Sequence, residues 1–232
     1  MKIPQWAAQL AAEFWAAAGA PSAFPRDLRS AIARAVPLTV VSLPNLTIQC
    51  AAAWLERQGK RLAIDAADRR VHGLLVACDG FGLAFIHATD DAAEQRFTLA
   101  HELAHFLRDY WRPRRRVEKH LGEHALEAFD GKRMATIEER IVGVVESLSL
   151  HCDIHVLERQ RSGRYATGRI AEAERNADRL ALELLAPAWH VASLGLSRRL
   201  RSEWGRALQE QYGLPEWAAR HYVELLAPEE VS

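Results

Sequence analysis

Apolar residues recur at helical spacing in seven stretches of the chain, several of which open on a capping residue and close on glycine or proline. The predicted helices cover 4–19, 25–36, 47–59, 90–109, 136–150, 170–187 and 200–226, the last of them divided in two at the YGLP sequence. Runs rich in β-branched and aromatic residues predict strands at 37–45, 61–65, 71–88 and 151–159. The run at 71–88 is typical of a hairpin that turns at Asp79 and Gly80. Because helices precede and follow a small sheet, without strand–helix alternation, the pattern indicates a mainly helical α+β fold.

The composition is that of a globular protein with a full hydrophobic core. Of the 232 residues, 49% are hydrophobic and 26% are charged, and this length fits one large domain or two small ones. The 30 basic and 30 acidic side chains cancel. The uniform positive field of a dedicated nucleic-acid-binding protein is therefore absent, and direct nucleic-acid binding is not expected.

The cysteines and the N-terminal stretch bear on the compartment. Cys50, Cys78 and Cys152 are scattered and odd in number, which argues against a disulfide framework and against a cysteine-rich zinc site. The apolar stretch at the start is interrupted by Pro4 and Glu13, unlike a secretory signal. No uncharged run approaches the roughly 20 residues that span a bilayer. We expect a cytoplasmic protein without a membrane partner.

The helix predicted at 90–109 contains the sequence FTLAHELAHFL. Residues four apart lie about 40° apart around a helix, so His101 and His105 project from one face and their nitrogens would reach one Zn²⁺ ion. Glu102 lies a further 100° round, where it would act as the general base on a water held by the metal. The predicted cofactor is one zinc ion in an active site; the alternatives are a structural zinc, which usually has four ligands and favours cysteine, and a chance motif.

A third ligand is predicted in the helix at 170–187. Glu174 lies on the apolar stripe that must face the interior, whereas Glu172 and Glu183 point nearly the opposite way. Asp178, one turn after Glu174, would accept the remaining ring N–H of a ligating histidine and fix its tautomer. The alternative is that Glu174 and Asp178 pair with Arg108 or another arginine.

Other histidine pairs compete with this site. The sequence HLGEH at 120–124 fits an inverted zinc motif, but its central glycine disfavours a helix, and a solvated surface helix without metal is the favoured interpretation. The sequence HCDIH at 151–155 lies in a predicted strand, where the same spacing is about 13 Å. One of its histidines, or Tyr165, would at most line the cleft. The arginine-rich stretches at 112–116 and 197–206 are interpreted as solvated faces, or as a docking site for an acidic partner.

Two segments resemble the ImmA/IrrE family of metallopeptidases. RFTLAHELAHFL at 96–107 is similar to that family's RFTLAHELGH helix, and EAERNADRLALELLAP at 172–187 is similar to its helix with the third zinc ligand. The resemblance implies a zincin-like domain with His101, His105 and Glu174 as zinc ligands and Glu102 as the base. We expect a single domain over 1–232 with a C-terminal helical pair at about 188–227. The separation of His105 and Glu174 is longer than is usual in the family, which indicates an insert at about 110–165 that would form a lid or a partner-docking surface.

The family resemblance also implies a function. Family members cleave, or bind and inactivate, helix-turn-helix repressors that control mobile-element, toxin–antitoxin or stress-response genes. We therefore expect a zinc metalloendopeptidase whose substrate is a separate repressor or a similar regulatory protein. The alternative is a catalytically weak zinc-containing module that inactivates a repressor or antitoxin by binding. The strand that ends the hairpin, LAFIHA at 83–88, is predicted to pair with an extended substrate by strand addition.

Overall fold

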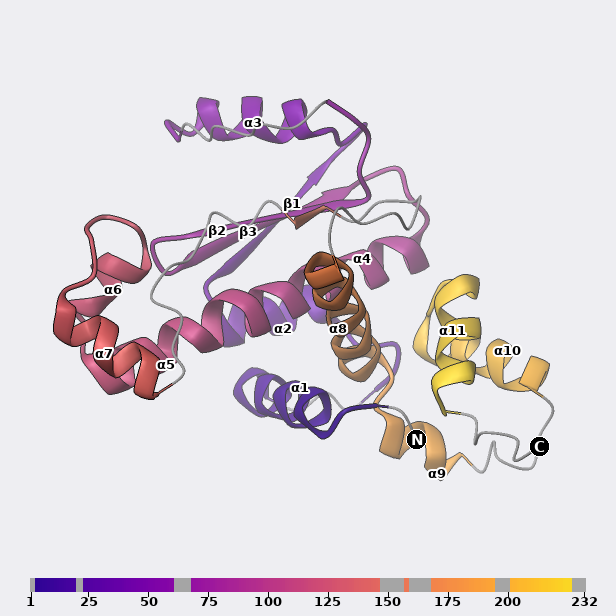
Figure 1. The fold of residues 1–232 in the computed structure, drawn as a ribbon. Coiled ribbons are helices and arrows are strands. Elements are labelled where there is room, and N and C mark those ends of the chain that lie inside the picture. Colours follow the sequence, from indigo (N-terminus) through magenta and orange to yellow (C-terminus); the bar gives the residue numbers. More distant parts are fainter. Residues whose placement is uncertain are drawn as a thin grey trace.

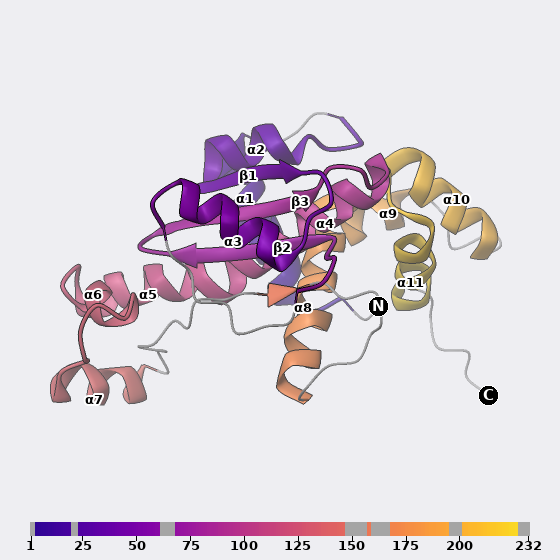
Figure 2. The ribbon, with the colours of Figure 1, turned by 90° about the horizontal axis from the view of Figure 1, so that it is seen from above.

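The computed structural model describes residues 3–19, 23–60, 68–146, 157–158, 168–194 and 201–226. It has the α+β architecture expected from the sequence. Figures 1 and 2 show a small sheet with α3 on one face, a layer of helices on the other, and further helices at each end. Within the described residues, no helix is long and apolar enough to span a membrane.

The strands form one mixed sheet in the order β1-β3-β2-β4. The strands are β1 (Leu38–Leu43), β2 (Gly73–Cys78), β3 (Phe81–His87) and β4 (Leu157–Glu158). Strand β3 runs parallel to β1 and antiparallel to β2, and β2 is antiparallel to β4. The hairpin turns at Asp79 and Gly80, both with positive φ (52° and 84°), as a tight two-residue turn requires. The predicted strand at 61–65 lies outside the described residues, as does most of the strand predicted at 151–159.

Five helices of the described residues lie close to their predicted positions. They are α1 (Gln5–Ala18), α2 (Leu28–Ala35), α3 (Ile48–Arg57), α4 (Ala92–His105) and α8 (Gly168–Leu185). Asp91 begins α4 by accepting hydrogen bonds from the N–H groups of Ala93 and Glu94. The carboxylate of Glu94, three residues after Asp91, accepts a hydrogen bond from Trp217 Nε1.

The segment between α4 and α8 contains several short helices. They are the π-helix η1 (Phe106–Trp111), α5 (Arg112–Leu121), α6 (Ala125–Phe129) and α7 (Ile137–Val145). A capping box begins α7, because Glu139 N–H donates to Thr136 Oγ1 and Thr136 N–H donates to Glu139 Oε2. The chain after α8 forms α9 (Ala188–Ser193), α10 (Arg201–Tyr212) and α11 (Glu216–Leu226), with the expected break at YGLP.

Alternation along β2 and β3 divides the interior into two apolar clusters. Leu74, Val76 and Phe85 pack with α3 in the smaller cluster. Leu75 and Ala84 face the other way, into the larger cluster that includes α1, α2, α4 and α8. Helix α4 therefore lies between the sheet and α8, with contacts on both sides, which is why nearly all of its second half is buried.

Candidate metal centre

His101 and His105 project from one side of α4 toward α8. Both imidazoles are buried, with 2% and 0% of the residue exposed. Their Nε2 atoms lie 3.1 Å apart. The four-residue spacing of the motif therefore brings two imidazole nitrogens together in the interior, as the sequence predicts.

Glu174 completes a group of three potential ligands. It projects from α8, where it is buried as predicted. Its Oε2 lies 3.3 Å from His101 Nε2, and its Oε1 lies 3.3 Å from His105 Nε2. Among the described residues, this is the one group of at least three His, Cys, Asp or Glu side chains arranged to hold a metal ion. Ligands at about 2.0–2.1 Å from a tetrahedral ion are about 3.3 Å apart, so the observed separations fit zinc.

Two outer carboxylates orient the imidazoles. Asp178 Oδ1 lies 2.9 Å from His101 Nδ1, as predicted, and Asp109 Oδ2 lies 2.8 Å from His105 Nδ1. When each Nδ1–H donates to its aspartate, both Nε2 atoms of the neutral rings carry lone pairs that point at each other and at Glu174. Three acceptors then face one another without a donor. A cation satisfies all three, so the donor set of this centre fits a divalent metal.

The electrostatics of the group lead to the same conclusion. Burial lowers the pKa of His101, but hydrogen bonds with Asp178 and Glu174 outweigh it and raise this pKa to about 10. Burial raises the pKa of Glu174, but hydrogen bonds with the two histidines outweigh it and lower this pKa to about 2. Both shifts have the same cause, because the carboxylates around the imidazoles favour a positive charge at this point. A metal cation would supply that charge.

The segment that contains α4 matches a known protein family. Residues 61–139 match the model Peptidase_M78, the IrrE N-terminal-like domain. This part of the chain is therefore similar to IrrE N-terminal-like domains. The match confirms the resemblance to the ImmA/IrrE family and a metallopeptidase-like fold, and it includes β2, β3 and α4 but ends before α8. Searches of curated proteins and of solved structures find no match.

Asp109 is a residue of the IrrE-like domain that the sequence reasoning missed. It lies in η1, four residues after His105, and its other oxygen pairs with Arg108 Nη1 at 2.8 Å. Arg108 is therefore paired with Asp109, whereas Glu174 contacts the two histidines and Asp178 contacts His101. The spacing of four residues from His105 was a signal in the sequence, since such side chains are neighbours on a helix.

We expect Asp109→Asn to weaken metal binding by about 10–100-fold, the usual effect of removing an outer partner of a ligating histidine. The asparagine keeps the size of the side chain but lacks the negative charge that polarises the imidazole. Competition with a fluorescent chelator measures the affinity. Glu118→Gln on the neighbouring helix α5, which removes an exposed carboxylate paired with Arg115, is the control. Equal affinities of the two variants would show that Asp109 does not support the site.

Glu102 lies beside the centre, in the space between α4 and the sheet. It is fully buried. A Cβ atom added to Gly73, the first residue of β2, would overlap Glu102 Oε1 and the methyl group of Thr98. Gly73 thus leaves the room that the carboxyl group of Glu102 occupies, a role that the sequence alone does not reveal because the two residues meet only in the fold.

We expect Gly73→Ala to displace the Glu102 carboxyl group, because it ends a flexible side chain and moves more easily than the backbone of the sheet. The predicted result is a folded protein that binds metal normally and hydrolyses peptides at least about tenfold more slowly, a part of the effect of removing a general base. Gly205→Ala is the control, since a Cβ there meets open space. An unchanged hydrolysis rate in Gly73→Ala would show that this close contact does not position Glu102.

Two predictions about the surroundings of the centre are wrong. Glu183 is 2% exposed, although the helical wheel directs it away from the interior. It accepts hydrogen bonds from Ala188 N–H and the Tyr222 hydroxyl, because the C-terminal half of α8 is enclosed on all sides. The sequence HLGEH does not form one surface helix either: α5 ends at Leu121, Gly122 has a φ of 82°, and α6 begins at Ala125.

The strand-addition prediction is also wrong for β3. This strand has β1 on one side and β2 on the other, so it offers no free edge to a substrate. The pairing that adjacency in sequence suggested is already made within the sheet. His151, His155 and Tyr165, which the sequence suggests as cleft residues, lie outside the described residues.

Proposed function

We propose that this protein is a zinc-dependent endopeptidase that cleaves a helix-turn-helix transcriptional repressor or a similar regulatory protein. The observation that carries the proposal is the convergence of His101, His105 and Glu174 in the interior, with Glu102 on the same helix as both histidines. The match to a peptidase domain over 61–139 supports the same reaction class.

Each residue of the centre has a role in this reaction. His101, His105 and Glu174 would hold the ion, while Asp178 and Asp109 keep the two imidazoles in the ligating tautomer. A bound zinc ion would polarise the scissile carbonyl and lower the pKa of a coordinated water to about 7. Glu102 would accept the proton of the attacking water and return it to the nitrogen of the leaving amine. The buried surroundings strengthen each of these charge interactions.

The resemblance to the ImmA/IrrE family supports the choice of substrate. In that family the partner is a repressor, and its removal switches on the repressed genes. The proposed setting is therefore the cytoplasm, and the proposed role is transcription regulation, including stress-response genes. The partner would be a separate protein, with no direct contact between this chain and nucleic acid.

Cleavage of a purified repressor tests the proposal. The protein is mixed with one equivalent of zinc and with a helix-turn-helix repressor encoded beside it, and the products are identified by intact mass. We expect two fragments whose masses sum to that of the substrate plus one water, and no fragments after a chelator has removed the metal. An intact repressor with the zinc-loaded protein, together with intact unfolded casein as a general substrate, would contradict the proposal.

A second candidate is a regulatory module that inactivates a repressor by binding. The burial of the three ligands and of Glu102 favours it, because an enclosed metal group also suits a structural role. The two candidates differ in their dependence on Glu102. Binding without hydrolysis requires the folded, metal-loaded chain but not its general base.

A further inference from the structure

Three arginines surround a cavity on the side of α4 that faces away from the metal centre. The cavity has a volume of about 330 Å³. It lies between the start of α2 and the N-terminal half of α4, and its lining is Pro25, Arg26, Asp27, Leu28, Arg29, Ala92, Gln95, Arg96 and Leu99. Leu99 lies about 160° round the helix from His101 at 100° per residue, so this cavity is separate from the proposed active site.

None of the three arginines is ion-paired within the part of the chain that the structure describes. Each guanidinium donates one hydrogen bond of 2.9–3.1 Å to a neutral acceptor. The pairs are Arg26 Nη1 with the Leu184 carbonyl, Arg29 Nη2 with Ser42 Oγ, and Arg96 Nη1 with the Gly213 carbonyl. A guanidinium has five N–H donors, so most of the donors of this cluster are left for another acceptor.

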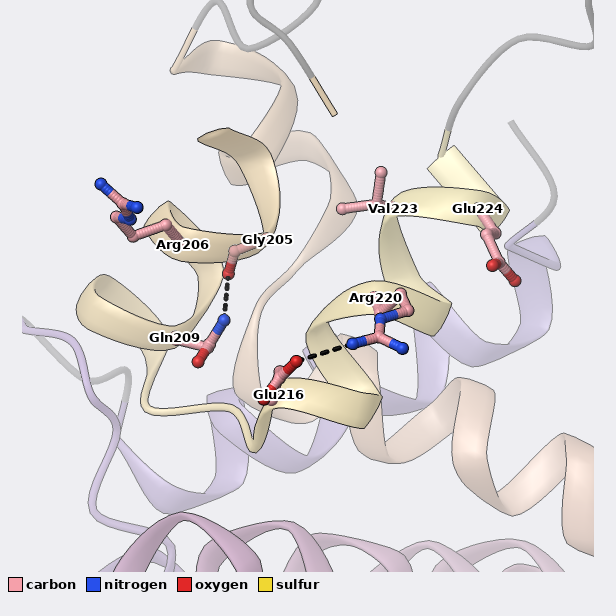
Figure 3. A pocket seen from close by; sticks show the side chains of 7 residues that line it. All are labelled: Gly205, Arg206, Gln209, Glu216, Arg220, Val223 and Glu224. Carbon is pink, nitrogen blue, oxygen red and sulfur yellow. Dashed lines mark hydrogen bonds and ion pairs between the residues drawn. The ribbon is translucent and has the colours of Figure 1, made fainter. Parts of the chain in front are cut away.

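Several arginines elsewhere in the described residues are paired with nearby carboxylates. Ion pairs of 3.0 Å or less join Arg108 to Asp109, Arg114 to Asp130, Arg115 to Glu118, Arg133 to Glu139 and Arg220 to Glu216. In the cavity of about 490 Å³ between α10 and α11, for example, Arg220 is bonded to Glu216 across one turn of α11 (Figure 3). The cavity beside α4 differs because its positive charges are not neutralised in this way.

The one carboxylate in the lining of the cavity, that of Asp27, already accepts hydrogen bonds. Asp27 is the N-cap of α2, and it accepts hydrogen bonds from Ser30 N–H at 3.1 Å and Ser30 Oγ at 2.5 Å. These bonds lower its pKa. Asp27 therefore caps α2, and its single negative charge does not balance the positive charges of the three arginines.

Arg26 is fixed in position and partly desolvated. Its guanidinium carbon lies 4.6 Å from the Trp15 ring centre and 4.9 Å from that of Phe24. Its Nε is buried without a hydrogen-bond partner. Burial lowers the pKa of Arg26 to about 10, although the charge of Glu183 acts in the opposite direction. A buried donor without an acceptor is costly, and an anion in the cavity would remove that cost.

We propose that this cavity binds a small dianion through Arg26, Arg29 and Arg96. Planar guanidinium groups match the oxygens of phosphates and carboxylates. The ligand is therefore a doubly charged oxyanion, either a phosphate group or a dicarboxylate. Leu28 and Leu99 also line the cavity, so a small carbon skeleton attached to the anion would contact apolar side chains. This site does not depend on the proposed peptidase activity.

Calorimetric titration of the full chain in Tris–chloride tests the site, with inorganic phosphate and succinate as separate probes at equal ionic strength. We expect one-to-one saturable binding of at least one probe. The probe that binds more tightly shows whether the site prefers a phosphate group or a dicarboxylate. Affinity should fall as sodium chloride is added, since the attraction is electrostatic. Absence of saturable binding by both probes would overturn the proposal.

Substitutions locate the binding. Arg29 is exposed, and its guanidinium donates a hydrogen bond to Ser42 Oγ. Arg29→Gln should weaken binding by about tenfold or more, as expected for loss of a charge-assisted hydrogen bond. Arg96→Lys keeps the positive charge but lacks the planar set of guanidinium N–H donors, so it should also weaken binding. Arg57→Gln, which removes an exposed charge from α3, should leave the affinity unchanged. Equal weakening in Arg57→Gln would show that general surface charge binds the anion, and would overturn the assignment.

Discussion

Glu102→Gln is expected to lower the rate of peptide hydrolysis by about 10²–10⁴-fold, the usual contribution of a general acid–base group. The amide occupies the same buried space between α4 and Gly73, but it does not accept a proton. Because Glu102 is not one of the three converging ligands, zinc binding should remain near one ion per chain. The measurement is the initial rate of repressor cleavage, with metal content determined on the same sample.

The same variant separates the two candidate functions. A Glu102→Gln protein that binds zinc, leaves the repressor intact and no longer relieves repression in cells supports proteolysis. If it relieves repression as fully as the unmodified protein, the function is binding and not hydrolysis. Glu56→Gln, at an exposed position of α3, is the control for the loss of a carboxylate.

Glu174→Ala is expected to remove the metal. It eliminates one of three inner ligands, so the loss of affinity should exceed the roughly 10–100-fold effect of removing an outer partner. Metal analysis of the purified protein after dialysis should find close to one zinc per chain in the unmodified protein and almost none in the variant. Hydrolysis should be lost together with the metal.

A matched control distinguishes this loss from a general effect on α8. Glu172→Ala removes an exposed carboxylate from the same helix and should keep both metal and activity. Circular dichroism of both variants checks that the helices are retained. A Glu174→Ala protein with full zinc content would contradict the assignment of the third ligand.

Local features of the chain are sufficient to predict most helices and to choose all four residues of the proposed site. A helix fixes the direction of each side chain by its position, so His101, Glu102 and His105 could be placed relative to one another from spacing alone. Glu174 could be chosen because α8 has one apolar stripe at its start. The close approach of α4 and α8, by contrast, depends on packing and could only be inferred from the need for a third ligand.

Features that depend on tertiary contacts were missed. Helical-wheel reasoning assumes one buried face, and it failed for Glu183 because the end of α8 is enclosed all round. Gly73 and Glu102 are brought together by the sheet, and neither residue carries a local signal of that contact. Strand order is likewise a long-range property, so the sequence does not reveal that β3 is an internal strand without a free edge.

The contacts that α8 makes with the two histidines of α4 have a consequence for stability. Asp178 belongs to α8 and contacts a histidine of α4, while Glu174 contacts both histidines from the same helix. An ion held by this group would tie together segments far apart in the chain, so its binding energy would add to the free energy of unfolding. Scarcity of zinc would then loosen α8 as well as stop hydrolysis, and the melting temperature would report how much of the protein carries metal.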